Sequence, residues 1–146
     1  MKPHPSVSVL IAAPDGIMSS ALRTFLNTQP GVHVTAQASS RSEAEQALKN
    51  QRPELLVLDC DLAERNSEDG ASLADTIHHL HGLHASVHII LLVNSLQQKQ
   101  AALEAGANQV ILKGNLDVQL PQTIAYYRSL ASVVHRGKTF ALPPHS

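Results

Sequence analysis

Asp59 is the residue whose place in the sequence is best suited to chemistry. It directly follows the apolar residues 55–58, and Pro53 stands shortly before them. An apolar run of this length predicts a central strand covered on both faces, because it is too short for a buried helix. In open α/β sheets, ligands and reacting groups gather at the carboxyl ends of the strands. We therefore expect Asp59 at the reactive edge of a parallel sheet.

The segments that must position Asp59 alternate between strand and helix patterns. Strands are predicted at residues 7–13, 32–38, 53–59, 87–93 and 110–112. Apolar residues at helical spacing predict helices near residues 17–26, 41–48, 73–80, 97–105 and 116–134. Five strands alternating with five helices indicate one α/β domain, with a parallel sheet covered on both faces. The polar segment 60–69, which is rich in acidic residues, is expected to form a long loop.

Composition excludes several classes of protein. The 146 residues carry a net charge of −1 and are 43% apolar, which is typical of a single globular domain. The basic residues are scattered, so we expect no direct binding of nucleic acid and no attraction to an anionic membrane. Cys60 is the single cysteine, which excludes an internal disulfide and fits a reducing compartment. With no signal-peptide pattern and no membrane-spanning run, the expected location is the cytoplasm.

Four short motifs resemble the receiver domains of bacterial response regulators. They are VLIA at 9–12, PELLVLD at 53–59, GAN at 106–108 and ILK at 111–113, and the resemblance covers roughly residues 7–134. The chain is most similar to receivers that precede LuxR-type helix-turn-helix domains, and RGKTF at 136–140 resembles the linker after them. The resemblance implies a flavodoxin-like (βα)5 fold with strand order 2-1-3-4-5. It places a receiver-like domain at 1–134 and a linker or C-terminal tail at 135–146.

The resemblance also implies a site and partners. In the family, the aspartate that ends the third strand accepts a phosphoryl group from a histidine kinase. An acidic pair after the first strand holds Mg²⁺, a Ser or Thr ends the fourth strand, and a lysine ends the fifth. Asp59 matches the acceptor and Lys113 matches the lysine. The expected partner is a histidine kinase or another signalling protein.

A second copy of the chain is the other implied partner. Family members pair through the fourth helix, fifth strand and last helix, here residues 97–105, 110–112 and 116–134, or through the first and last helices. Tyr126, Tyr127 and Arg128 on the last helix are candidate contributors to such a surface, although the helical pattern also allows Tyr127 to be a core residue.

The sequence departs from the family where the metal should be held. Ala13 and Pro14 stand in place of the acidic pair, and neither side chain can ligate a metal ion. Mg²⁺ needs carboxylate charge to be held at all. Only Asp59, with Asp15 or Asp61 as substitutes, remains available. We therefore expect no cofactor or weakly bound Mg²⁺, slow or absent phosphorylation, and a domain that acts through protein–protein interaction.

The hydroxyl residue that ends the fourth strand is also replaced. Depending on where a gap is placed in the alignment, its position falls on Leu91, Val93 or Asn94. Ser95 could substitute only after a rearrangement of the backbone. We expect the loss of the acidic pair to matter more than the loss of this hydroxyl.

Two other functions remain open from the residues. The first is a phosphorylation-competent receiver in which Asp59 accepts phosphate and Asp15 substitutes for the missing ligands. The second treats Asp59 and Asp61 as the two-aspartate motif of haloacid-dehalogenase-like phosphatases, in which one aspartate attacks phosphorus and the other is acid and base. That motif normally ends the first strand and precedes a later acidic pair, whereas no such pair follows Lys113. We expect the chain not to be an enzyme.

Each candidate residue also has a purely structural interpretation. Lys113 could form an ion pair with Asp59 without any phosphate, and Asp15 could form a turn or helix cap ahead of Gly16. Cys60 is expected to be a small core residue. The histidines 78, 79, 81, 84 and 88 are expected to be exposed near the end of a helix that Gly82 interrupts, rather than to bind a metal.

Overall fold

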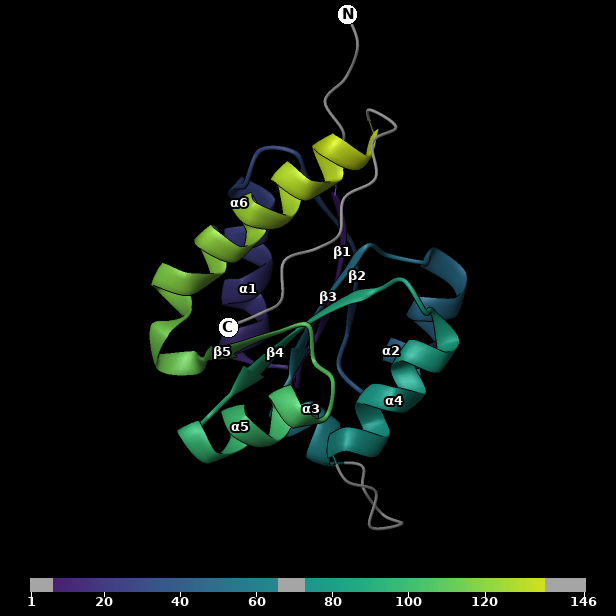
Figure 1. The fold of residues 1–146 in the computed structure, drawn as a ribbon, viewed down its shortest axis with the longest axis vertical. Helices are drawn as coiled ribbons and strands as arrows, with labels where there is room; N and C mark the ends of the chain where they lie inside the picture. The colour runs from purple at the N-terminus through teal and green to yellow at the C-terminus, as the bar shows by residue number, and fades with distance from the viewer. Residues whose placement is uncertain (1–6, 66–72, 136–146) are drawn as a thin grey trace, which may run out of the picture.

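The computed structural model describes residues 7–65 and 73–135, with the side chains of residues 64–65 and 130–135 left aside (Figure 1). Its centre is a parallel sheet of five strands in the order β2-β1-β3-β4-β5. The strands are β1 (Val7–Ala12), β2 (Val32–Ala38), β3 (Leu55–Asp59), β4 (His88–Val93) and β5 (Gln109–Leu112). The predicted fold and strand order are therefore confirmed. The linker-like residues 136–140 lie outside the described residues.

Helices cover both faces of the sheet (Figure 1). One face is covered by α1 (Ile17–Thr28) and α6 (Leu116–His135), the latter preceded by the 3₁₀ turn η1 (Lys113–Asn115). The other face is covered by α2 (Arg41–Gln51), α4 (Leu73–Leu83) and α5 (Leu96–Glu104). A short helix, α3 (Cys60–Arg65), follows β3 directly. This two-sided cover explains why the central strands read as continuous apolar runs.

Strand β3 is buried along its whole length, and its side chains alternate between the two cores. Leu56 and Leu58 belong to the core under α2, α4 and α5, whereas Leu55 and Val57 belong to the core under α1 and α6. Alternation along the strand directs the next side chain, Asp59, to the α1 and α6 side. Only 3% of Asp59 is exposed to solvent. The sheet thus carries a buried carboxylate at its carboxyl edge.

The expected loop at residues 60–69 is wrong in its first part, because residues 60–65 form α3. The cause lies in Asp59, whose Oδ1 accepts a hydrogen bond of 2.8 Å from the backbone N–H of Asp61. A carboxylate that accepts from the first turn of a helix satisfies a free amide there and favours helix formation. The same side chain therefore ends the strand and starts the helix. Residues 66–69 of the expected loop lie outside the described residues.

The expectation for the histidines is partly wrong. Helix α4 continues through Gly82, and His84, just beyond its end, is buried. Its Nε2 lies 2.8 Å from the backbone oxygen of Pro53, and its Nδ1 lies 3.3 Å from Nη2 of Arg52. A glycine near a helix end costs only about 1 kcal/mol, which local packing can outweigh.

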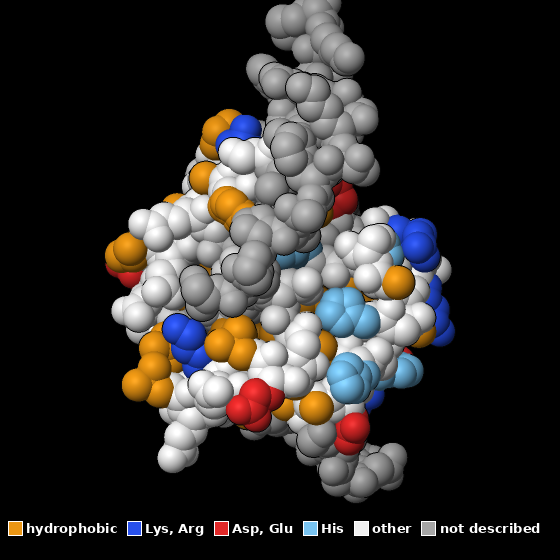
Figure 2. Space-filling model, viewed as in Figure 1, with side chains coloured by type: hydrophobic (Ala, Val, Ile, Leu, Met, Phe, Trp, Pro, Cys, Tyr) orange, Lys and Arg blue, Asp and Glu red, His pale blue; other side chains and the backbone are white. Residues whose placement is uncertain are grey.

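The remaining histidines follow the expectation more closely. His78 and His79 are exposed and His81 is partly so, and Figure 2 shows histidine side chains on the surface over α4. His88 lies on β4 with its ring centroid 5.0 Å from that of Tyr127. None of these histidines joins a cluster with metal-ligand geometry among the described residues. Also within the described part of the chain, no helix combines the length and apolar character needed to cross a bilayer.

Two helix ends carry signals that depend on nearby residues in the sequence. Ser40 caps α2, with its Oγ accepting a hydrogen bond of 3.1 Å from the N–H of Glu43. The Glu43 carboxylate in return accepts from the N–H of Ser39, at 2.8 Å. Gly106, after α5, has a left-handed φ of 101°, a conformation that favours glycine at this position. These local signals were readable because each depends on residues only a few positions apart.

Substituting two glycines in parallel tests this account of the helix ends. Gly106→Ala should lower the free energy of unfolding by about 1–2 kcal/mol, because a Cβ is strained at positive φ. Gly82→Ala should raise it by about 0.5–1 kcal/mol, because Gly82 is helical and an added Cβ meets no atom within 4 Å. Urea unfolding measures both. Effects of the same sign at the two positions would contradict the assigned conformations.

Candidate functional site

The centre of the candidate site is an ion pair between Asp59 and Lys113. Lys113 follows β5, and its Nζ reaches across the end of β4 to lie 2.8 Å from Oδ1 of Asp59. The Asp59 side chain is 4% exposed and that of Lys113 17%. The structural ion pair that the sequence allowed is therefore present. It brings together the two residues that resemble the acceptor and the lysine of receivers.

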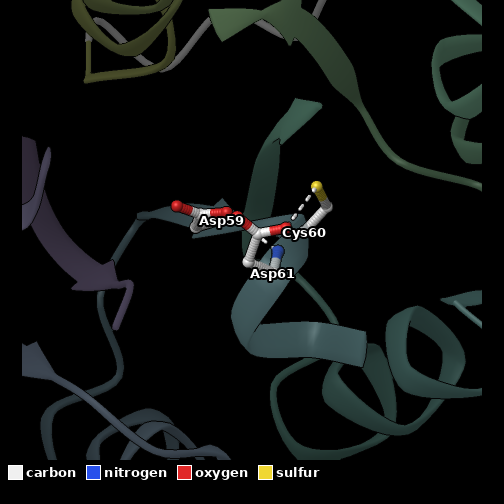
Figure 3. Close-up of side chains that lie close together, drawn as sticks. All are labelled: Asp59, Cys60 and Asp61. Atoms are coloured by element: carbon white, nitrogen blue, oxygen red, sulfur yellow. Dashed lines mark hydrogen bonds between the residues drawn. The ribbon is translucent and has the colours of Figure 1, made fainter. Parts of the chain in front are cut away.

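Asp61 adds a second carboxylate on the same ammonium group. Its Oδ2 lies 2.9 Å from Nζ of Lys113, and its Oδ1 accepts a hydrogen bond of 3.1 Å from Nδ2 of Asn94. Figure 3 shows Asp59 and Asp61 close together at the start of α3, with the Cys60 thiol beside Asp61. The ends of β3, β4 and β5 thus contribute to one polar cluster, which consists of Asp59, Asp61, Asn94 and Lys113.

These contacts shift two acid–base equilibria. The hydrogen bond from Lys113 holds the pKa of Asp61 below its ordinary value, against the opposing effect of partial burial. Burial by itself would lower the pKa of Lys113, but the hydrogen bonds and charges of Asp59 and Asp61 together outweigh burial and raise it. Both shifts favour the charged forms, the carboxylate of Asp61 and the ammonium of Lys113.

At the end of β4, the three residues considered for the position of the missing hydroxyl residue have different surroundings. Leu91 and Val93 are fully buried in the core under α2, α4 and α5. Asn94, one residue beyond the strand, donates its side-chain amide to Asp61 and makes a longer contact of 3.5 Å with Sγ of Cys60. Of the three, Asn94 is the residue with a side chain in the polar cluster.

After β1, the structure places Ala13 and Pro14 where the resemblance puts the acidic pair. Ala13 is buried and donates its N–H to the backbone oxygen of Ala38. Asp15 is exposed and lines a shallow hollow between α1 and β2, together with Ser20 and Gln37. It does not cap α1, because Gly16 occupies the N-cap position without a side-chain cap. Of the two structural interpretations of Asp15, the helix cap is therefore wrong, whereas a turn is present at residues 15 and 16.

Within the described residues, the one group of His, Cys, Asp or Glu compact enough for a metal ion consists of Asp59, Cys60 and Asp61. One ligand atom from each lies within 4.8 Å of the others. Cys60 is a buried cysteine that forms no disulfide and belongs to the core, as expected from the sequence. Asp15 is not part of this group.

Sequence reasoning missed Gln98, although a signal for it was present. Ser95 and Gln98 have capping-box spacing, and the Oγ of Ser95 accepts from the N–H of Gln98 at 3.2 Å. Oε1 of Gln98 accepts from the N–H of Asn94 at 2.7 Å. The cap of α5 is therefore joined directly to a residue of the polar cluster.

The pKa shift of Asp61 predicts how its contribution to stability varies with pH. Asp61→Asn should lower the free energy of unfolding at pH 7 by no more than about 1 kcal/mol, because the side chain is 49% exposed. A carboxyl whose pKa is lowered on folding contributes stability above its unfolded pKa and loses it as pH falls through the folded value. The difference between wild type and variant should therefore shrink below the ordinary value of 3.8.

Urea unfolding at pH 7 and pH 3 measures this difference. Asp117→Asn is the matched control, because Asp117 is exposed in the first turn of α6 and no contact joins it to the cluster in the described structure. A difference between wild type and Asp61→Asn that is the same at both pH values would contradict the shift.

Comparison with known proteins supports the resemblance. The sequence matches the family described as response regulator receiver domain over residues 9–125. Among curated proteins, it is 25% identical over 118 residues to a protein-glutamate methylesterase/protein-glutamine glutaminase of Hydrogenovibrio crunogenus. That match covers 77% of this chain and 29% of the relative, so the chain spans less than a third of that protein.

Solved structures show the same fold. A LuxR-family response regulator from Aurantimonas sp. SI85-9A1 is 20% identical with a TM-score of 0.71, covering 85% of this chain and 86% of that one. The isolated receiver domain of RcsB from Salmonella enterica serovar Typhimurium, determined with the phosphomimetic BeF3⁻, gives 20% identity and a TM-score of 0.71, covering 92% of each chain.

A third structure, the response regulator domain of Thermotoga maritima CheB, is 17% identical with a TM-score of 0.67, covering 85% of this chain and 97% of that one. The chain spans 63% of longer RcsB chains. Because the family match extends over most of its length, this chain belongs to the response regulator receiver domain family and is a receiver domain of two-component signalling.

Proposed function

We propose that this receiver holds Mg²⁺ weakly or not at all, is phosphorylated slowly or not at all, and signals by contact with another protein. Two features of the site together carry the proposal: the acidic pair is missing, and a lysine ammonium contacts the carboxylates that remain. Ala13 and Pro14 replace the acidic pair, while Lys113 contacts both remaining carboxylates at 2.8 and 2.9 Å.

The residues present do not fit Mg²⁺. This ion requires near-octahedral oxygen coordination and gives up its water reluctantly, so it needs several anionic oxygens. The compact group offers two carboxylates and one thiol, and a thiol is a soft ligand that does not suit Mg²⁺. The Lys113 ammonium already lies between the two carboxylates and repels a second cation.

Without a firmly held cation, Asp59 is a poor phosphoryl acceptor. Phosphoryl transfer depends on positive charge placed against the oxygens of the transferring group. In this site, Lys113 supplies one positive charge, and two carboxylates share it. The alternative in which Asp15 restores a metal site has less support, because Asp15 is exposed beside α1 and β2.

We also propose that the domain has no catalytic activity of its own. The phosphatase alternative needs Asp61 free to act as acid and base. Instead, both oxygens of Asp61 are engaged, by Lys113 and by Asn94, and Asp59 ends the third strand rather than the first. A chromogenic phosphate ester that is hydrolysed by the wild type and spared by Asp61→Ala would contradict this part of the proposal.

The proposed partners are a histidine kinase or other signalling protein, or a second copy of the chain, in the cytoplasm. The scattered basic residues favour a protein over nucleic acid or membrane as the direct contact. Because α3 is an extra helix, the two pairing surfaces of the family correspond here to α5, β5 and α6, and to α1 and α6.

The surface formed by α1 and α6 is the better supported of the two for self-association. It contains a largely apolar hollow of about 710 Å³, lined among others by Met18, Phe25 and Leu116. Ile17 on its rim is 90% exposed, compared with 70% for Leu96 on α5. Tyr126 is 39% exposed, whereas Tyr127 packs against the core, so Tyr126 is the more accessible of these two expected contributors.

Phosphorylation chemistry tests the main proposal. Wild-type protein incubated with Mg²⁺ and acetyl phosphate should show no stoichiometric adduct by intact mass. The double variant Ala13→Asp/Pro14→Asp should gain a Mg²⁺-dependent adduct, because it restores two carboxylates beside Asp59. Circular dichroism verifies that this variant is folded.

Asp59→Asn is the control for the position of the adduct. A stoichiometric adduct on the wild type that disappears in Asp59→Asn would overturn the proposal. Beryllofluoride with Mg²⁺, followed by ¹⁹F NMR, gives an independent measure of adduct formation at Asp59. The wild type should show no bound beryllofluoride signal, and a signal that disappears in Asp59→Asn would overturn the proposal.

Sedimentation velocity tests the partner surface. The wild type should form a concentration-dependent dimer, which Ile17→Lys should weaken at least tenfold because it places a charge against an apolar contact. Leu96→Lys is the matched control on α5 and should leave the dimer intact. A wild type that is monomeric at every concentration, or a dimer weakened only by Leu96→Lys, would contradict the α1 and α6 surface.

A further inference from the structure

A chain of polar contacts leads from the ion pair to the first turn of α5. Lys113 contacts Asp59 and Asp61, Asp61 accepts from Asn94, and the N–H of Asn94 donates to Gln98 at 2.7 Å. We propose that Asp61 is a positioning residue that joins the Asp59–Lys113 pair to α5. The start of α5 is thereby held in one arrangement without a bound cation or phosphoryl group.

Asp61 is fixed from three directions. Its backbone N–H donates to Asp59 at the end of β3, at 2.8 Å. Its Oδ2 contacts Lys113 after β5, and its Oδ1 contacts Asn94 after β4. Although the side chain is half exposed, both of its oxygens make charge-assisted contacts, so rotating it breaks at least one of them. Asp61 therefore transmits the position of one strand end to the others.

On the α5 side, Asn94 is part of the helix cap. It precedes the N-cap residue Ser95, and its N–H is held by the same Gln98 side chain that completes the capping box. A displacement of Asn94 therefore disturbs the cap of α5. The Cys60 thiol lies 3.8 Å from Oε1 of Gln98, which places the start of α3 against the same turn.

The charges of the cluster favour this arrangement. Asp59 is buried and requires a cation, and Lys113 supplies it. Asp61, from the first turn of α3, holds the ammonium from the other side. The inference rests on the proposed function, because tightly bound Mg²⁺ would compete with Lys113 for both carboxylates.

Amide hydrogen exchange on the full chain, in buffer with EDTA, tests the inference. Asp61→Ala and Asn94→Ala should each raise the exchange rates of the Gln98 and Lys99 amides, roughly threefold to tenfold, because both N–H groups bond to Ser95. If Asp61 acts through Asn94, the double variant should exceed the larger single effect by little. Asp117→Asn should leave the rates unchanged.

NMR of the Asn94 side-chain amide separates this linkage from a general loss of stability. Its Nδ2 proton shifts should change in Asp61→Ala and not in Gly106→Ala, which destabilises the domain at the opposite end of α5 from Asn94. Unchanged α5 exchange in Asp61→Ala, or strictly additive effects in the double variant, would overturn the inference. Because these measurements exclude Mg²⁺, they can fail while the wild type remains adduct-free, and can succeed even if an adduct forms with Mg²⁺.

Discussion

The ion pair between Asp59 and Lys113 is the interaction on which the rest of the site depends. A carboxylate buried at the end of a central strand carries a desolvation penalty of several kcal/mol unless it is paired and hydrogen-bonded. The structure meets that requirement twice, with the ammonium of Lys113 and with the N–H of Asp61. The first contact ties β5 to β3, and the second starts α3. Both contacts compensate the buried negative charge of Asp59.

Under the proposed function, the loss of the acidic pair leaves Lys113 as the cation that balances the charge of Asp59. Ala13 and Pro14, which directly follow β1, carry no carboxylate with which to bind a divalent cation. Lys113 is then free of competition, and Asp61 becomes its second anionic partner. Under the proposed function, the contacts that take the place of a bound cation make the cluster self-contained, and through Asn94 they extend to α5.

Most of the fold was predictable because it follows from short-range patterns. The apolar runs of β3 and β4 have no polar alternation, and this pattern predicts strands covered on both faces. The caps at Ser40 and Gly106 depend on neighbours within a few residues. One error arose where packing outweighed local propensity, because α4 continues through Gly82. The other was a missed local signal, because residues 60–65 are helical and Asp59 caps them.

The sequence alone determined the α/β alternation, the place of Asp59 at a strand end, and the absence of acidic side chains at positions 13 and 14. Only the tertiary structure decided which side chains meet Asp59 and Asp61. Lys113 and Asn94 are 52 and 33 residues away from Asp61, and their contacts depend on strand order and side-chain direction. The burial of His84 against Pro53, 31 residues away, was equally hidden. Local spacing specifies the elements, whereas contacts between distant strand ends exist only once the sheet has assembled.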